Sequence, residues 1–242
     1  MVTSAANRID AAPGTAETAW QRWLTSLQPP QLDVTRWSSA VIVAAHPDDE
    51  VLGAGGILAL LAGTGARIRL VAVTDGERSD PAADPVALAR TRVAESATAL
   101  GLLGAQRADV VRLRLPDTGV ADAEAELAER LAGLCRGFEV CLAPWENDAH
   151  ADHEAAGRAA RRIHDHVLSY PVWMWHWAAP ADPDVPWERA VSVPLPAAAV
   201  TRKAAAIGAF HSQLTSRAGL AGPILPAGFV AHFTRPQEVL FR

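Results

Sequence analysis

Cysteine is scarce in this 242-residue chain, which contains only Cys135 and Cys141. Two spaced thiols among apolar neighbours are typical of reduced core residues, so we expect neither a disulfide framework nor a cysteine metal site. Long apolar runs are absent as well, because no stretch reaches the roughly 20 residues that a membrane-spanning helix needs. The N-terminus lacks a basic region followed by an apolar core. We therefore expect no signal peptide and a cytoplasmic location.

A surplus of positive charge is also missing. Acidic residues outnumber basic ones by 27 to 22, and the net charge is −5 with both signs interspersed along the chain. Nucleic-acid binding needs a basic patch or stripe, so a nucleic-acid partner is not expected. The length suits one α/β domain with a large core, although length alone does not exclude two small ones. The sequence leaves a homo-oligomer open.

Residues 46–56, His-Pro-Asp-Asp-Glu-Val-Leu-Gly-Ala-Gly-Gly, form the most informative stretch of the chain. The apolar run before it, residues 40–45, is typical of a strand that is buried on both faces of a parallel sheet. An imidazole and two carboxylates therefore follow the carboxyl end of a strand, where open α/β sheets bind ligands. His46 together with Asp48 or Asp49 offers the donor set of a catalytic divalent metal. Taken alone, the stretch indicates a metal site and a simple aspartate helix cap about equally.

A second polar cluster occupies residues 144–153, again directly after an apolar strand-like run. It carries His150 and His153, three residues apart, with an aspartate between them. In a doubly wound sheet the first and fourth strands can lie side by side, so we expect this cluster to approach His46 and Asp49. Two clusters with compatible ligands, each after a predicted strand, favour a metal site over isolated histidines.

These two motifs, Ala-His-Pro-Asp-Asp-Glu at 45–50 and His-Ala-Asp-His at 150–153, resemble the LmbE/PIG-L family of metal-dependent deacetylases. The resemblance covers roughly residues 38–242. It implies a Rossmann-like three-layer α/β fold with a mostly parallel sheet, which agrees with the alternation of predicted strands and helices. It also implies zinc as cofactor with His46, Asp49 and His153 as ligands. Two imidazoles and one carboxylate suit iron(II) and cobalt(II) too.

The resemblance also implies catalytic roles. Asp48 would be the general base, His150 would stabilise the oxyanion and protonate the leaving amine, and Asp152 would orient a histidine. Arg78 lies in the polar loop after the second predicted strand, where it would reach a substrate hydroxyl or carboxylate; a solvated loop charge is the alternative. One position departs from the mycothiol-biosynthetic branch, because Asp148 stands where that branch has a catalytic tyrosine. Either an acid replaces the phenol or, as we favour, the chain belongs to another branch.

The flanking regions carry further expectations. Apolar residues at helical spacing predict a short amphipathic helix in an N-terminal segment, residues 1–36, ahead of a single domain over residues 37–242. Trp173, Trp175 and Trp177 alternate along the chain, which predicts one face of a strand. That face would pack under a helix, as we favour, or would stack against a sugar near the site.

The sequence therefore predicts a zinc-dependent hydrolase that removes an N-acyl group, in the first place acetyl, from a sugar-containing small molecule. The metal hydrolase follows from the residues, whereas the amide and the amino-sugar-like substrate follow from the resemblance. A near alternative is a metalloamidase that acts on a thiol conjugate or another natural-product amide. A distant alternative is a non-catalytic sugar-binding module with a degenerate metal site, which an intact ligand set beside a free carboxylate disfavours.

Overall fold

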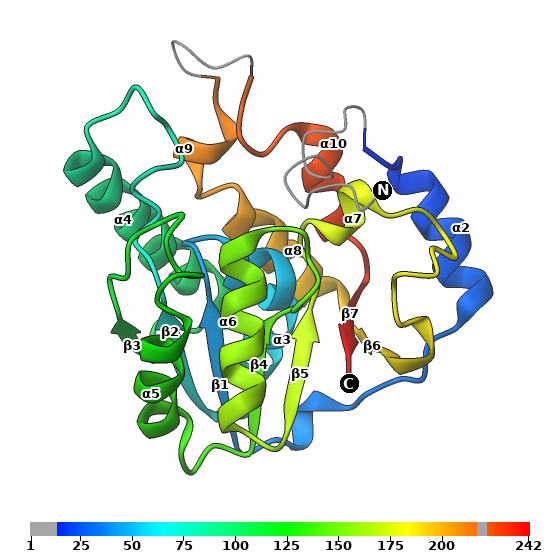
Figure 1. Cartoon of the computed structure of the whole chain (residues 1–242). Coiled ribbons are helices and arrows are strands. Elements are labelled where there is room, and N and C mark those ends of the chain that lie inside the picture. The colour runs from blue at the N-terminus through cyan, green and yellow to red at the C-terminus, as the bar shows by residue number, and fades with distance from the viewer. Residues whose placement is uncertain (1–13, 217–221) are drawn as a thin grey trace.

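The computed structural model describes residues 14–216 and 222–242, and in this part of the chain seven strands form one sheet in the order β3-β2-β1-β4-β5-β7-β6 (Figure 1). The strands are β1 (Ser39–Ala44), β2 (Arg67–Ala72), β3 (Asp109–Arg112), β4 (Val140–Pro144), β5 (Val167–Tyr170), β6 (Ala190–Pro194) and β7 (Gln237–Phe241). The first five strands of that order, from β3 to β5, are parallel to one another. Strand β7 is antiparallel to both β5 and β6.

The direction of winding reverses between β1 and β4, which pair in parallel through Ala40–Val140, Val41–Cys141 and Ile42–Leu142. All six residues of β1 and all five of β4 are buried, as expected for strands that are covered on both faces. The carboxyl ends of β1 and β4 therefore lie side by side at the switch point of the sheet. This neighbourhood brings the two sequence motifs together.

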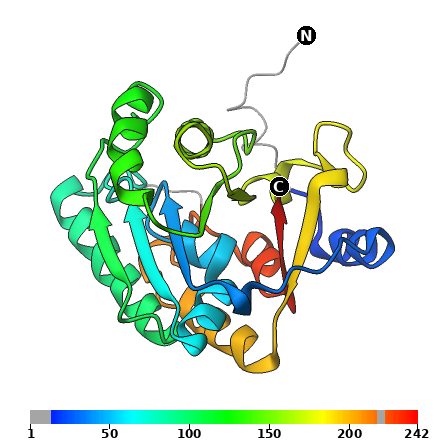
Figure 2. The same ribbon diagram turned by 90° about the horizontal axis from the view of Figure 1, so that it is seen from below.

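Helices cover both faces of the sheet, and they complete the expected three-layer α/β fold (Figure 2). The helices are α2 (Glu17–Leu27), α3 (Asp49–Thr64), α4 (Pro85–Leu103), α5 (Glu124–Cys135), α6 (Ala151–Ile163), α7 (Met174–Trp177), α8 (Ala197–Ile207), α9 (His211–Leu214) and α10 (Ala227–Val230). Short 3-10 turns occur at η1 (Val34–Arg36), η2 (Trp187–Arg189) and η3 (Ala231–Phe233). Among the described residues, none of these helices has both the length and the apolar content that crossing a bilayer requires.

The alternation of side chains along β1 divides the interior into two cores. Ala40, Ile42 and Ala44 pack in the core that also holds α3 and α8. Val41 and Val43 face the other way, into the core under α5 and α6. The helices on both faces of the sheet therefore pack against β1, the strand that leads into the first motif.

Helix α3 is interrupted at Ala54, where φ is −140° and ψ is 17°. The buried carboxylate of Glu238, on β7, accepts the N–H groups of Gly56 and Ile57 at 2.6 and 2.9 Å. Lys203, the only lysine of the sequence, donates to the carbonyl of Leu52 at 2.8 Å and to Glu238 at 2.6 Å. This ion pair satisfies the backbone groups that the interruption frees, and so it holds the first turn of α3 in place.

Helix α2 packs on the same core as the sheet. Trp20 is fully buried, and its indole N–H donates to the carbonyl of Trp175 at 2.8 Å. At the start of the helix, Glu17 accepts hydrogen bonds from Arg235 at 2.6 and 2.7 Å. The division of the chain into a segment at 1–36 and a domain at 37–242 stays a prediction.

The expected tryptophan strand is wrong. Strand β5 ends at Tyr170, and residues 174–177 form the short helix α7. The backbone N–H groups of residues 172–174 all donate to the carboxylate of Asp148, so they are not available to a neighbouring strand. The three tryptophans consequently do not share a face. Trp175 is buried against Trp20, whereas Trp173 lines the cavity described next.

Candidate active site

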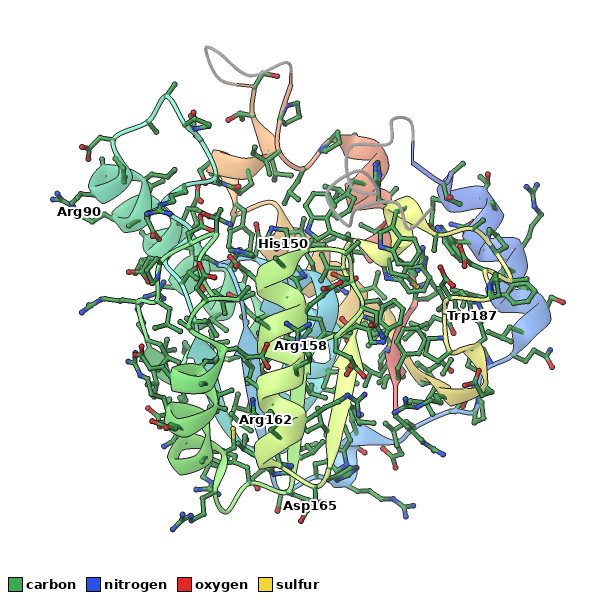
Figure 3. The ribbon with its side chains drawn as sticks, in the orientation of Figure 1. Arg90, His150, Arg158, Arg162, Asp165 and Trp187 are labelled. Atoms are coloured by element: carbon green, nitrogen blue, oxygen red, sulfur yellow. The ribbon has the colours of Figure 1, made fainter. Side chains whose placement is uncertain are left out.

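A cavity of about 150 Å³ opens at the carboxyl edge of β1 and β4. Its lining includes six of the seven residues that the sequence predicts for the site, namely His46, Asp48, Asp49, Arg78, His150 and His153. The seventh, Asp152, lies directly behind His46. Figure 3 labels His150 at the N-terminal end of α6, above the strands. A larger cavity of about 610 Å³ beside α4 contains none of these residues.

The three predicted metal ligands converge in this cavity. His46 Nδ1 lies 3.2 Å from His153 Nε2. Asp49 contacts both rings, with Oδ2 at 3.5 Å from His46 Nδ1 and Oδ1 at 3.3 Å from His153 Nε2. A tetrahedral zinc with bonds of about 2.0–2.1 Å spaces its ligands about 3.3–3.4 Å apart. The spacing of the three donors therefore fits one divalent cation.

The outer nitrogen of each of these rings contacts a buried carboxylate. His46 Nε2 lies 3.1 Å from Asp152 Oδ2 and 3.2 Å from Asp117 Oδ1. His153 Nδ1 lies 2.8 Å from Asp148 Oδ2. Carboxylates only accept, so each ring donates its outer N–H and turns a lone pair inward. Two lone pairs and a carboxylate that face one another are an arrangement that could hold a cation, and such orienting carboxylates are usual behind metal-bound histidines.

The site is rich in negative charge. Five buried carboxylates surround the two rings: Asp48, Asp49, Asp117, Asp148 and Asp152. Burial lowers the pKa of His46, but hydrogen bonds with Asp117, Asp152 and Asp49 outweigh it and raise the pKa well above its ordinary value. Burial also lowers the pKa of His153, but Asp49 and Asp148 outweigh it and the net shift is upward. The surroundings favour positive charge at this point, whether from protons or from a cation.

A second group of possible ligands shares His46 but is already satisfied by the protein. His46, Asp117 and Asp152 place ligand atoms within 4.8 Å of one another. The two oxygens of Asp152, however, accept the N–H groups of Thr118 and Val120 at 2.8 and 3.1 Å. These carboxylates therefore fit an orienting role better than a ligand role. Asp117 was missed in the sequence, although its position in a polar loop after β3 indicated the same sheet edge.

Asp148 is fully buried and is not among the residues that line the cavity. Its Oδ1 accepts from the N–H groups of Val172 and Met174 at 3.0 and 2.9 Å, and its Oδ2 accepts from Trp173 N–H at 2.9 Å and from His153. An acid with four protein donors is not a substitute for a substrate-facing phenol. Asp148 instead holds His153 in place.

Asp48 has a strained backbone, with φ at 128° in a region that favours glycine. It stands at the N-cap position of α3, but its side chain caps no N–H group, which excludes the simple cap interpretation for this residue. Arg92 Nη2 holds Asp48 Oδ2 at 3.0 Å and the carbonyl of Pro47 at 2.7 Å. Burial raises the pKa of Asp48 to about 7, with Arg92 opposing and Asp49 adding to the shift. The sequence did not reveal this role of Arg92.

His150 is the N-cap of α6, and its Nδ1 accepts the N–H of Asp152 at 3.3 Å. The proton of a neutral His150 ring therefore resides on Nε2. Burial, followed by the charges of His153 and His46, lowers the pKa of His150 to about 3. The ring is consequently a neutral hydrogen-bond donor in this arrangement.

Two exposed or half-buried side chains complete the rim of the cavity. The backbone N–H of Arg78 is tied to Asp117 at 2.8 Å, and its guanidinium contacts Thr118 Oγ1 at 3.3 Å. The ring of Trp173 stacks on His150 at 6.4 Å between centroids, with 19° between the planes. An arginine donor and an aromatic face at one rim are groups that a sugar could contact.

Comparison with known proteins gives one family and several similar structures. The family described as GlcNAc-PI de-N-acetylase, PIG-L, matches residues 41–164. The N,N'-diacetylchitobiose deacetylase of Pyrococcus horikoshii aligns with 19% identity and a TM-score of 0.59 over 84% of this chain and 81% of that one. The A40926 pseudoaglycone deacetylase Dbv21 aligns with 21% identity and a TM-score of 0.60 over 85% and 96%.

The conserved protein TT1542 of Thermus thermophilus aligns with 28% identity and a TM-score of 0.55 over 73% of this chain and 80% of that one. No curated protein is similar enough in sequence to count as a match. The likeness to the two deacetylases, at 19% and 21% identity, supports the fold. The family match covers most of β1, all of β4 and both polar motifs.

Proposed function

The chain belongs to the PIG-L family, GlcNAc-PI de-N-acetylase, whose match spans just over half of its length, and on this premise we propose that it is a metal-dependent deacetylase. Its substrate would be an N-acylated, amino-sugar-like small molecule. The observation that carries the proposal is the convergence of His46, Asp49 and His153 in one cavity with a separate carboxylate, Asp48. If His46, Asp49 and His153 only formed stabilising ion pairs, the separate carboxylate of Asp48 would not be needed in the same cavity.

Zinc is the proposed cation, held by His46 Nδ1, His153 Nε2 and the Asp49 carboxylate. Three protein ligands are the number that catalytic zinc sites keep, and iron(II) and cobalt(II) accept the same donors. When bound, such a cation supplies Lewis-acid polarisation of the amide carbonyl and lowers the pKa of a bound water. Asp117, Asp152 and Asp148 would keep the two rings in the tautomer that this requires.

The proton transfers fall to this chain's own residues. We propose that Asp48 Oδ1 accepts the proton of the attacking water, because Arg92 already donates a hydrogen bond to Oδ2. The water oxygen bonds to the acyl carbon, and the Nε2–H of His150 donates to the developing oxyanion. Asp48 then returns the proton to the nitrogen as the C–N bond breaks, which yields a carboxylic acid and an amine; the acid then loses its remaining proton to solvent. A pKa near 7 suits a group that both accepts and donates.

This assignment changes the predicted role of His150. The sequence interpretation gave it the leaving-group proton as well as the oxyanion. A neutral ring whose pKa is lowered to about 3 has no proton to spare beyond the one on Nε2. We therefore propose His150 for the oxyanion alone and Asp48 as the proton carrier.

The size of the cavity supports a short acyl group. Ligand pockets for drug-sized molecules usually measure roughly 300–1,000 Å³. The cavity here measures about 150 Å³, enough for an acyl group and the part of a ring next to it. The deacetylases of similar fold are named for a diacetylated disaccharide and a pseudoaglycone, and the first of these names supports a sugar-containing substrate. The location, the lack of a nucleic-acid partner and the oligomeric state stay predictions from the sequence.

The test measures metal content and amine release together. Purified protein would be assayed by elemental analysis and for primary amine from N-acetylglucosamine and its glycosides. We expect wild type to hold about one metal per chain and to release amine. Asp48→Asn should keep the metal but lose turnover by roughly 10²–10⁴-fold, because only the proton carrier is removed. Asp49→Asn should lose both metal and activity.

Asp122→Asn, at an exposed position, is the matched control and should resemble wild type. Equal metal loss in Asp48→Asn and Asp49→Asn would refute the division of roles. Metal without amine release would retain the site and move the search to thiol conjugates and other amides. A wild type that binds no metal would overturn the proposal.

A further inference from the structure

Gln213 has an unexplained buried acceptor at the edge of the cavity. The residue lies on α9, lines the cavity and is 1% exposed. Its amide nitrogen donates to Ser212 Oγ at 2.8 Å and to Ser79 Oγ at 3.3 Å. Its oxygen, Oε1, is buried, and no residue that the structure describes donates to it. A buried acceptor without a donor is costly, so a group that satisfies it in the working protein is expected.

The direction of this amide is fixed by its neighbours. Ser212 Oγ donates to Glu95 Oε2 at 2.6 Å, and Ser212 N–H donates to Glu95 Oε1 at 2.7 Å. The hydroxyl proton of Ser212 is thus committed to the carboxylate, and its oxygen can only accept from Gln213. A flipped amide would place two acceptors together. Oε1 is therefore the end that points away from Ser212.

The side chain is also held rigidly. Glu95 ties the start of α9 to α4, and the backbone carbonyl of Gln213 accepts the N–H of Leu225 at 2.9 Å. Leu225 and Ser79 line the same cavity. An acceptor that is anchored in this way from both sides is preorganised for a ligand group in one position.

We propose that Gln213 Oε1 accepts a hydrogen bond from a ring hydroxyl that flanks the acylamino group of the substrate. This inference rests on the proposed function and names a specificity determinant for it. Arg78 at the same rim is a donor only, so it recognises substrate acceptors. Gln213 supplies the complementary acceptor, which a sugar hydroxyl can satisfy. Substrates without that hydroxyl leave Oε1 unpaired and are disfavoured.

The experiment compares an N-acetylglucosamine glycoside with its 3-deoxy, 4-deoxy and 6-deoxy analogues. The proteins are the metal-loaded wild type, Gln213→Met, and Gln106→Met as an exposed control. We expect wild type to process the 3-deoxy analogue, the one that lacks the hydroxyl beside the acylamino group, with kcat/KM lowered roughly 10- to 100-fold, and the 4-deoxy and 6-deoxy analogues like the parent. Gln213→Met should lose a similar factor on the parent glycoside but should slow the 3-deoxy analogue no further. Metal content should be equal in all three proteins.

Two results would overturn the inference. One is a wild type that processes all analogues as well as the parent, a comparison that needs no variant. The other is a uniform loss across all substrates in Gln213→Met, because a structural role moves every substrate equally. If metal-loaded wild type releases no amine from any sugar, the proposed function fails. Calorimetric titration with the same sugars then decides the inference, and equal affinity in wild type and Gln213→Met would contradict it.

Discussion

The substitution Asp148→Asn tests how the protein selects the tautomer of His153. The carboxylate accepts four hydrogen bonds, from His153 Nδ1 at 2.8 Å and from three backbone N–H groups at 2.9–3.0 Å. Asparagine keeps the shape but replaces one acceptor oxygen with an NH₂ group. Two of the four donors must then face another donor. The structure allows two outcomes.

In the first outcome the NH₂ group faces Val172 and Met174, and two buried N–H groups lose their acceptor. Each such loss costs about 1–3 kcal/mol, or about 2–6 kcal/mol in all. In the second outcome the NH₂ group faces Trp173 and His153. The Trp173 N–H then loses its acceptor, whereas the His153 ring can change its tautomer and accept from the NH₂ group. The His153 ring then accepts at Nδ1 and carries its proton on Nε2, the nitrogen that lies 3.2 Å from His46 Nδ1.

The second outcome costs less folding free energy, so we expect it to prevail. The unfolding free energy of the metal-free protein should fall by about 1–3 kcal/mol. Metal affinity should fall by at least 10- to 100-fold, because the inward nitrogen of His153 no longer presents a lone pair. Denaturant unfolding measures the first quantity, and competition with a chromogenic chelator measures the second.

The matched control is Glu146→Gln, two residues earlier on the same loop. Glu146 contacts Arg161 and Ser169 and does not touch the cluster. This control should retain the metal affinity of wild type. An Asp148→Asn protein whose metal affinity stays within about threefold of wild type would refute the tautomer argument.

Two further predictions concern ion pairs away from the cavity. Burial raises the pKa of Glu17, but hydrogen bonds from Arg235 outweigh it and lower the pKa to about 2, against 4.5 unperturbed. Above pH 4.5, wild type should therefore have a larger unfolding free energy than Glu17→Gln, and this advantage should disappear as the pH falls toward 2. A difference in unfolding free energy that does not change with pH would contradict this prediction. Lys203→Met leaves Glu238 buried without its cation, so the unfolding free energy should drop by about 3–5 kcal/mol in urea titrations. A drop as small as that of exposed Arg202→Met would disprove it.

The fold and the predicted ligands could be read from local patterns. Unbroken apolar runs predicted strands that are buried on both faces, and β1 and β4 are such strands. The order of strands and helices placed β1 beside β4 at a switch point. Since parallel strands end at one sheet edge, the motifs after them had to meet. His46, Asp49 and His153 were therefore within reach of sequence reasoning.

The tryptophan stretch shows where a local pattern fails. Alternating aromatic residues favour a strand when their N–H groups pair with a neighbouring strand. Here the Asp148 carboxylate takes the N–H groups of residues 172–174 instead, and α7 follows. A tertiary hydrogen bond outweighed the local preference.

By itself, the sequence determined the three-layer fold and the meeting of two polar motifs at one sheet edge, because strand burial and motif position are encoded locally; the choice of candidate ligands within those motifs came from the family resemblance. Only the tertiary structure decided the partners of those residues: Asp148 behind His153, Asp117 behind His46 and Arg92 on Asp48. It likewise decided that Gln213 lines the cavity and that its buried side-chain oxygen has no donor among the described residues. Most of these contacts join distant residues, and which of several carboxylates or amides a buried group meets depends on how the loops pack. No spacing rule along the chain contains that information.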